Sequence, residues 1–160
     1  MATRLVQDLV YEAPLDTVAR MLSDPAFREE VCVEIGATSY DVSIDGDASA
    51  KDVTIDMQLP TEGIPSFAKK FVGATTTVVQ AESWSTPGHG DVKVTIPGKP
   101  GEMVGTAVLV EKDGVTTETV ELEIRVRIPL VAGRIEDLIS KLLSKSLQAE
   151  HRVGQRYLGR

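Results

Sequence analysis

The chain has 160 residues, 42% of them hydrophobic, and 24 acidic against 17 basic residues give it a net charge of −7. This length predicts a single domain, residues 1–160, whose core needs neither a disulfide nor a metal ion. The acidic balance disfavours binding to nucleic acid or anionic lipid, which both need basic patches, and an aromatic content of 4% offers few stacking platforms for single strands.

The single cysteine, Cys32, excludes an internal disulfide and suits a reducing compartment. Within a helical stretch it is predicted to be a small buried hydrophobic residue. No targeting signal follows Arg4, where apolar and polar residues alternate, and no window approaches 18 uncharged apolar residues. We therefore expect a cytoplasmic protein without stable membrane insertion.

The N-terminal part predicts one strand and two short helices. Residues Thr3–Tyr11 alternate in polarity as a strand does. A first helix begins after Pro14, a favourable helix start, and ends at Ser23-Asp24-Pro25. A second carries Phe27 on its apolar stripe and ends at Gly36, a good C-cap residue. With two or three turns each, these helices form a V-shaped support and not a crossover between parallel strands.

Six more strands are expected before the last helix, separated by turn signals such as Asp45-Gly46-Asp47 and Asp113-Gly114. In the last strand, Glu121, Glu123, Arg125 and Arg127 alternate with an apolar face. One side of the sheet then faces water, which indicates an antiparallel sheet. The expected strands are Ser39–Ile44, Lys51–Leu59, Thr75–Trp84, Val92–Ile96, Met103–Glu111 and Val115–Ile128.

The connection Pro60–Gly73 is irregular, because 14 residues replace the tight turns found elsewhere. Ile64, Phe67 and Phe71 lie at helical spacing around Pro65, and long loops in compact domains are often functional lids. Two interpretations remain open. The segment is either a lid over a cavity mouth or a surface helix packed on the sheet edge.

A long amphipathic helix is predicted from Arg134 to Leu158, about 37 Å at 1.5 Å per residue. A helix of this length needs a broad surface, which the curved sheet supplies. A sheet gripping one long helix can enclose an apolar cavity. The core is expected to contain Leu138, Leu142, Val120, Leu122 and Ile124.

Polar residues interrupt the apolar face of this helix at Ser146, Glu150 and Tyr157. Buried polar groups need partners, so these side chains could point into a cavity and orient a ligand. Alternatively, the helix extends past the sheet near Ser146 and Glu150 is solvated. The candidate ligand-binding residues are Tyr40, Phe67, Phe71, Trp84, Leu142, Ser146, Glu150 and Tyr157.

Catalytic patterns are scarce in the sequence. His89 lies in a Pro-Gly-His-Gly turn, and neither it nor His151 has metal-ligand spacing to Cys32. Elsewhere, Asp and Glu follow the alternation of a solvent face and are interpreted as surface residues. We assign no catalytic residue, no metal site and no cofactor.

The order of one strand, two short helices, six strands and a long C-terminal helix resembles the helix-grip fold of the START and birch-pollen-allergen superfamily. That α+β group includes lipid-transfer domains and polyketide cyclases. The resemblance spans essentially the whole chain and implies a curved antiparallel sheet of about seven strands around the last helix. Short motifs also resemble an actinobacterial family of unknown function within that group: Ala13-Pro14, Asp24-Pro25-Ala26-Phe27-Arg28, Leu59-Pro60, Ile64-Pro65-Ser66-Phe67, Phe71-Val72-Gly73, Glu82-x-Trp84 and Ile128-Pro129-Leu130-Val131.

Three functions are compatible with these observations. The favoured hypothesis is binding or carriage of a small apolar or amphipathic ligand (a lipid, polyketide or isoprenoid) in an internal cavity. The alternative is an enzyme of the cyclase or aromatase type that uses the same cavity, which the absence of an internal histidine or of clustered carboxylates disfavours. A third is a protein-interaction module whose core is filled.

Overall fold

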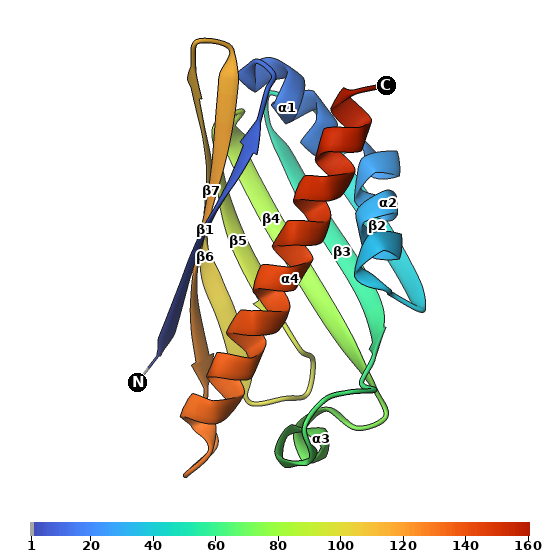
Figure 1. Ribbon diagram of the computed structural model, residues 1–160, viewed down its shortest axis with the longest axis vertical. Coiled ribbons are helices and arrows are strands. Elements are labelled where there is room, and N and C mark those ends of the chain that lie inside the picture. Colours follow the sequence, from blue (N-terminus) through green and yellow to red (C-terminus); the bar gives the residue numbers. More distant parts are fainter. Residues whose placement is uncertain (1) are drawn as a thin grey trace.

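The computed structural model describes residues 2–160, which form one curved antiparallel sheet and the helices that cover it (Figure 1). The strand order is β1-β7-β6-β5-β4-β3-β2, so the first strand of the chain closes the sheet beside the last one. The elements in chain order are β1 (Thr3–Tyr11), α1 (Leu15–Leu22), α2 (Pro25–Ile35), β2 (Ser39–Gly46), β3 (Lys51–Pro60), α3 (Ser66–Val72), β4 (Thr75–Thr86), β5 (His89–Thr95), β6 (Gly101–Lys112), β7 (Val115–Val126) and α4 (Ala132–Leu158).

The helix-grip architecture expected from the sequence is confirmed. Strands β2 to β7 pair with their sequence neighbours, and β1 joins β7 in the register Leu5↔Leu122. The largest difference from the expected boundaries is at His89. We expected this residue in a turn, but it begins β5, because the turn closes at Pro87-Gly88 and the strand pairs with β4 and β6 from His89 onward.

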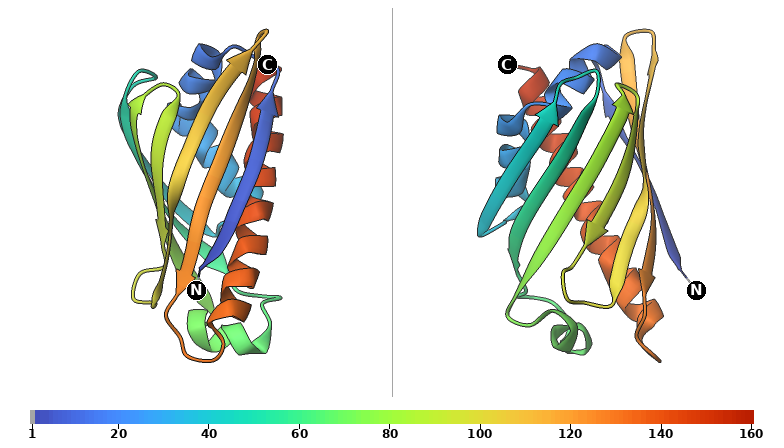
Figure 2. Two further views of the ribbon diagram at one scale, coloured as in Figure 1. Left: turned by 90° about the vertical axis from the view of Figure 1, so that its left-hand side faces the viewer. Right: turned by 180° about the vertical axis from the view of Figure 1, so that it is seen from behind.

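Helices α1 and α2 lie at one end of the concave face, as the V-shaped support predicted (Figure 2). The side chain of Asp24 caps α2 by accepting a hydrogen bond of 2.9 Å from the backbone N–H of Ala26. Gly36 ends the helix with a φ of 99°, a left-handed conformation that glycine adopts without steric cost. Cys32, near the end of α2, is buried as expected.

Helix α4 crosses the concave face and packs mainly on β1, β7 and α2 (Figure 1). Its contacts are tight at both ends. Ile135 and Ile139 are buried in the first half, and Val153 is buried in the last. Gly154 allows the closest approach, because a Cβ there would lie 2.5 Å from the ring of Tyr11.

The middle of α4 packs less tightly than we expected. Val120, Leu122 and Ile124 are in the core as predicted, with 4%, 3% and 0% of their surface exposed. The expectation was wrong for Leu138, which is only partly buried, and for Leu142, which is 40% exposed. The reason is the sheet curvature, since α4 spans a hollow between its two packed ends. Among the described residues, no helix is long and apolar enough to cross a membrane.

Candidate functional site

The hollow beneath α4 consists of two adjoining spaces. The outer chamber has a volume of about 590 Å³ and lies between the middle of α4, the ends of β3 and β4, and α3. The inner chamber, of about 60 Å³, lies deeper, among α2, the centre of the sheet and the second half of α4. Both are bordered by the same six residues: Ile35, Met57, Gln80, Val94, Leu143 and Ser146.

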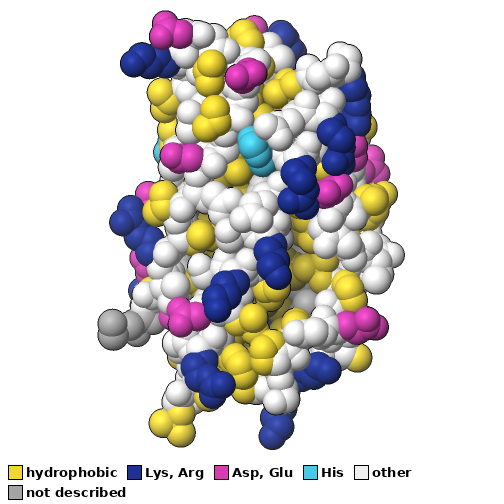
Figure 3. Space-filling model, in the orientation of Figure 1, with side chains coloured by type: hydrophobic (Ala, Val, Ile, Leu, Met, Phe, Trp, Pro, Cys, Tyr) yellow, Lys and Arg dark blue, Asp and Glu magenta, His cyan; other side chains and the backbone are white. Residues whose placement is uncertain are grey.

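The outer chamber has mainly aliphatic walls, such as Leu59, Val78 and Ile96. Figure 3 shows hydrophobic side chains gathered around a hollow on this face, beside α4 and above α3. Its lining also includes polar residues of α2 and α4, where Glu34 accepts a hydrogen bond of 3.1 Å from Arg152. The chamber therefore combines an apolar interior with a charged margin.

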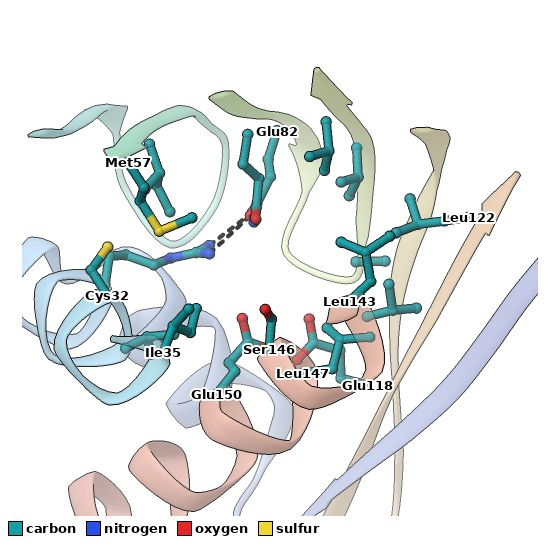
Figure 4. Close-up of a pocket in the computed structure, with 18 residues that line it drawn as sticks. Cys32, Ile35, Met57, Glu82, Glu118, Leu122, Leu143, Ser146, Leu147 and Glu150 are labelled. Atoms are coloured by element: carbon teal, nitrogen blue, oxygen red, sulfur yellow. Dashed lines mark hydrogen bonds and ion pairs between the residues drawn. The ribbon is translucent and has the colours of Figure 1, made fainter. Parts of the chain in front are cut away.

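The inner chamber contains charged side chains that are almost fully buried. Arg28 and Glu82 are 2% and 6% exposed, and Glu118 and Glu150 are 3% and 8% exposed. Arg28 comes from α2, Glu82 from β4, Glu118 from β7 and Glu150 from α4. In Figure 4, Glu150 and Ser146 face the space opposite Glu82. Charges at this depth need partners, and the four side chains differ in whether they have them.

Arg28 and Glu82 form a bidentate ion pair. The two terminal nitrogens of Arg28 donate to the Glu82 carboxylate at 2.9 and 2.8 Å, and its Nε donates to the Leu22 carbonyl at 2.9 Å. Trp84 Nε1 and Gln80 Nε2 also donate to Glu82. Burial alone would raise the pKa of Glu82, but the Arg28 guanidinium and these hydrogen bonds hold it below its ordinary value.

Glu118 and Glu150 have no such compensation. Oε1 of Glu118 and Oε2 of Glu150 are enclosed and have no hydrogen-bond partner among residues 2–160. Burial raises the pKa of Glu118 well above its ordinary value, and the adjacent Glu150 raises it further. Burial also raises the pKa of Glu150, although the charge of Arg28 opposes this. The inner chamber therefore holds protons on carboxyl groups at a pH where exposed glutamates have lost theirs.

Two more buried polar groups lie near this cluster. The Tyr11 hydroxyl has no hydrogen-bond partner among the described residues, and burial, then the charge of Glu150, raises its pKa. The ammonium of Lys51 also lacks a hydrogen-bond partner there and lies 4.7 Å from the ring centroid of Trp84. Burial lowers the pKa of Lys51.

The structure separates the eight residues that we selected from the sequence into two groups. Phe71 and Leu142 line the outer chamber, Ser146 borders both chambers, and Glu150 lines the inner one. Glu150 is buried, so the alternative in which it is solvated beyond the sheet is wrong. The other four residues lie outside both linings: Tyr40, Phe67, Trp84 and Tyr157.

Each of these four has another environment. Tyr40 is 39% exposed on β2. Trp84 packs on Gly90, where a Cβ would come within 2.5 Å of its ring, and it donates to Glu82. Tyr157 lies beyond the cavity, packs on Phe27 and donates to Asp24 at 2.6 Å. Phe67 is covered by the Arg134 guanidinium, 4.1 Å from its ring centroid.

The segment Pro60–Gly73 borders the outer chamber through Ile64, Ala68 and Phe71. Phe71 is 8% exposed, whereas Lys69 and Lys70 lie on the exposed side of α3. The helix thus lies at the end of the cavity, where a lid would be. The lid function itself stays a prediction.

Arg28, Glu82 and Glu118 were missed in the sequence, where we interpreted carboxylates outside α4 as surface residues. That interpretation was wrong for Glu82 and Glu118, and so was the expected absence of clustered internal carboxylates. The signal was present, because Glu118 has the same strand parity as Val120 and Leu122, and Glu82 has that of Trp84. No cluster of His, Cys, Asp and Glu within residues 2–160 has the arrangement of a metal site.

The sequence is similar to proteins that have no described function. The profile of a family described as "Protein of unknown function (DUF2505)" matches residues 7–158. An uncharacterized protein of Mycobacterium tuberculosis is 27% identical over 156 residues, which covers 89% of this chain and 88% of the relative.

Solved structures share the fold at low sequence identity. A START superfamily protein from Mycobacterium smegmatis superposes with a TM-score of 0.55 at 15% identity, over 95% of this chain and 97% of the other. The di-domain ARO/CYC protein StfQ from the steffimycin biosynthetic pathway gives 0.67 at 9% identity, over 98% of this chain and 50% of the other. The START-like fold expected from the sequence and the relation to a family of unknown function are confirmed.

Proposed function

The chain belongs to the DUF2505 family, and from its cavity we propose that it binds or carries a small apolar or amphipathic ligand of the lipid, polyketide or isoprenoid class. The observation that supports this most is the outer chamber. Its volume of about 590 Å³ lies within the range of small-molecule sites, about 300–1,000 Å³. Its walls are mainly aliphatic, so affinity would come from removing apolar ligand surface from water.

The packing of α4 also supports a binding role. Leu142 and Leu138 lie over the hollow without becoming fully buried, although their positions are on the inward face of an otherwise well-packed helix. Apolar side chains that line a space gain contacts when a ligand fills it. A filled core, as an interaction module would have, is disfavoured by the volume that these side chains leave open.

A second candidate is an enzyme of the ARO/CYC type, the kind of protein named among the structural neighbours. The observation that favours it is the inner chamber, where the pKa of Glu118 and that of Glu150 are raised. A protonated carboxyl beside a bound reactive chain is suited to general acid catalysis. Glu118 and Glu150 would be the acid and base, and the apolar walls would fold the substrate.

Native mass spectrometry of the protein purified without added ligand tests the binding function. We expect an added mass that is lost on denaturation, with the released molecule apolar or amphipathic. The stripped protein should then rebind it with a raised melting temperature, as mass action requires. A protein that carries no ligand and shows no thermal shift with fatty acids, isoprenoid alcohols or polyketides would contradict the proposal.

The recovered ligand can also be used to distinguish a carrier from an enzyme. In the carrier, Glu118→Gln leaves the chemical structure of the recovered molecule unchanged. In the enzyme, incubation with the parent protein converts the substrate and Glu118→Gln abolishes the conversion while binding persists. Chromatography of the ligand before and after incubation distinguishes the two.

A further inference from the structure

The inner chamber contains more carboxyl groups than cations to pair with them. Each of the three nitrogens of Arg28 already donates a hydrogen bond, Nε to the Leu22 carbonyl and the two terminal nitrogens to the Glu82 carboxylate. Within residues 2–160, no ion pair joins a basic side chain to Glu118 or Glu150. The two carboxyls therefore lack the compensation that Glu82 has.

Both carboxyls belong to the lining of this space and are more than nine-tenths buried. Each has an enclosed oxygen without a hydrogen-bond partner, which is uncommon for buried acceptors. The two groups are close enough to hydrogen-bond to each other when one is protonated. A single shared proton engages one oxygen of each group and leaves the other oxygen of each able to accept a hydrogen bond from a ligand. The missing partner is a group that donates several hydrogen bonds.

The position of the pair in the cavity limits what that group can be. The inner chamber, of about 60 Å³, takes a small polar head, whereas the adjoining outer chamber of about 590 Å³ takes the body of a ligand. The residues that border both are mostly apolar, among them Met57, Val94 and Leu143. The site thus fits a molecule that is polar at one end only.

We propose that the cavity binds an amphipathic amine, whose protonated nitrogen donates hydrogen bonds to Glu118 and Glu150 and whose apolar body fills the outer chamber. This inference rests on the proposed ligand-binding function. An ammonium donates three hydrogen bonds and accepts none, which matches ionised carboxylates that only accept. Its positive charge balances one ionised carboxylate, and the proton that the pair can share neutralises the other. A hydroxyl supplies a single donor and no charge, and an anionic head is repelled.

Proton release accompanies this binding. Other titratable or charged groups close to the pair are Tyr11 on β1, Arg28 on α2, Lys51 on β3, Glu82 on β4 and His151 on α4. Glu82 is neutralised by Arg28, and Lys51 lies over Trp84. In Glu118 and Glu150, burial favours the protonated form of the carboxyl group. A cation placed between the two carboxyls favours their ionised forms and displaces such a proton.

Three eight-carbon probes that differ only at the head test the proposal: octylamine, octanol and octanoate. Calorimetry at pH 7.5 should give an affinity for octylamine at least tenfold higher than for octanol, with octanoate weakest. Repeating the titration in buffers of different ionisation enthalpy should reveal proton release with octylamine alone. Glu118→Gln and Glu150→Gln should each weaken octylamine binding at least tenfold and leave octanol unchanged.

Asp137→Asn is the matched control, because it removes the same charge from an exposed position on α4. It should change none of the three affinities, which excludes a general effect of the net charge. Octanoate binding as tightly as octylamine, or Gln variants that bind octylamine normally, would overturn the amine inference and leave the binding function standing. If none of the probes binds, both proposals fail. The probe series in the unchanged protein is decisive even if a variant does not fold.

Discussion

At the scale of single residues, the ion pair between Arg28 and Glu82 is the strongest constraint on the inner chamber. We expect Arg28→Met to lower the free energy of unfolding by about 3–5 kcal/mol, because it leaves the Glu82 carboxylate buried without its cation. Urea unfolding monitored through Trp84 measures this. The double variant Arg28→Met/Glu82→Leu should recover most of the loss, because no unpaired charge remains. A double variant as unstable as Arg28→Met would contradict this account.

Glu118, unlike the ion pair, lowers the stability of the folded protein, and it does so increasingly as the pH rises. Its pKa is raised in the folded state, so the folded protein holds this proton to a higher pH than the unfolded chain does. Stability is therefore lost as the pH rises from the unfolded value of about 4.3 toward the folded pKa. Glu118→Gln carries no such proton. The free energy of unfolding of this variant should exceed that of the parent by about 1–3 kcal/mol at pH 8 and match it near pH 4.

Urea unfolding of both proteins at pH 4.5, 6 and 8 checks this prediction. Glu82 contributes in the other direction, since its pKa is lowered and its stabilisation is lost in acid. That contribution is common to parent and variant and cancels in the difference. A difference that stays constant with pH would show that Glu118 does not titrate between the folded and unfolded states as proposed.

These residues show how far side-chain roles follow from sequence. Ser146 and Glu150 were identified because a helical face places them among apolar neighbours. The same reasoning applied to a strand identifies Glu118 as inward-facing. A single acidic residue at an inward position, however, is easily interpreted as the point where the buried part of the strand ends. Arg28 gave no periodic signal, since its burial depends on Glu82, 54 positions away in the sequence. Pairing across such separations is a tertiary property.

At the scale of elements, α4 is well packed at its two ends and poorly packed in its middle. Leu142 lies over the hollow and is 40% exposed, so Leu142→Ala should cost less than about 1 kcal/mol in the ligand-free protein. Ile135→Ala on the same helix, where the side chain is 2% exposed, should cost about 2–5 kcal/mol. Chemical unfolding of the two variants gives the comparison. Equal losses would mean that the middle of the helix is packed after all.

Helix α3 tests whether the end of the cavity opens. Phe71 lines the outer chamber, whereas Phe67 is outside it beneath Arg134. We therefore expect Phe71→Ala to weaken ligand binding several-fold and Phe67→Ala to leave it nearly unchanged, which revises the sequence-based expectation that both touch the ligand. Hydrogen exchange should be faster in residues 66–72 than in β3 and β4 and should slow with ligand. Protection equal to that of the strands would make α3 a fixed wall.

The elements themselves were largely predictable. The alternation in β1 and β7 and the capping residues Asp24 and Gly36 act locally, so they are visible in a short stretch of sequence. How tightly each side chain packs was not predictable, as Leu142 shows. Leu142 lies on an apolar helical face, as a core residue would, but the curvature of the opposite sheet decides whether anything contacts it.

At the scale of the whole molecule, the cavity results from a mismatch between a strongly curved sheet and a straight helix. Helix α4 is held to β1 and β7 on one side and to α2 on the other. The central strands therefore face a space that no side chain of the fold fills. The fold is shared with structural neighbours at 9–15% identity, and a shared fold does not by itself specify a ligand.

A single large side chain can test whether this space is the binding site. Val78 lines the outer chamber from β4, and we expect Val78→Trp to occupy part of its volume. The added apolar burial should leave the free energy of unfolding equal to or up to about 2 kcal/mol above that of the parent, because empty space receives the ring. Ligand binding, measured by calorimetry, should fall by at least tenfold. Val104→Trp, on an exposed position of β6, is the control and should bind normally.

A destabilised Val78→Trp protein would indicate a chamber that closes in solution, since overpacking a filled core costs about 1–3 kcal/mol. A stable variant with full affinity would place the ligand elsewhere.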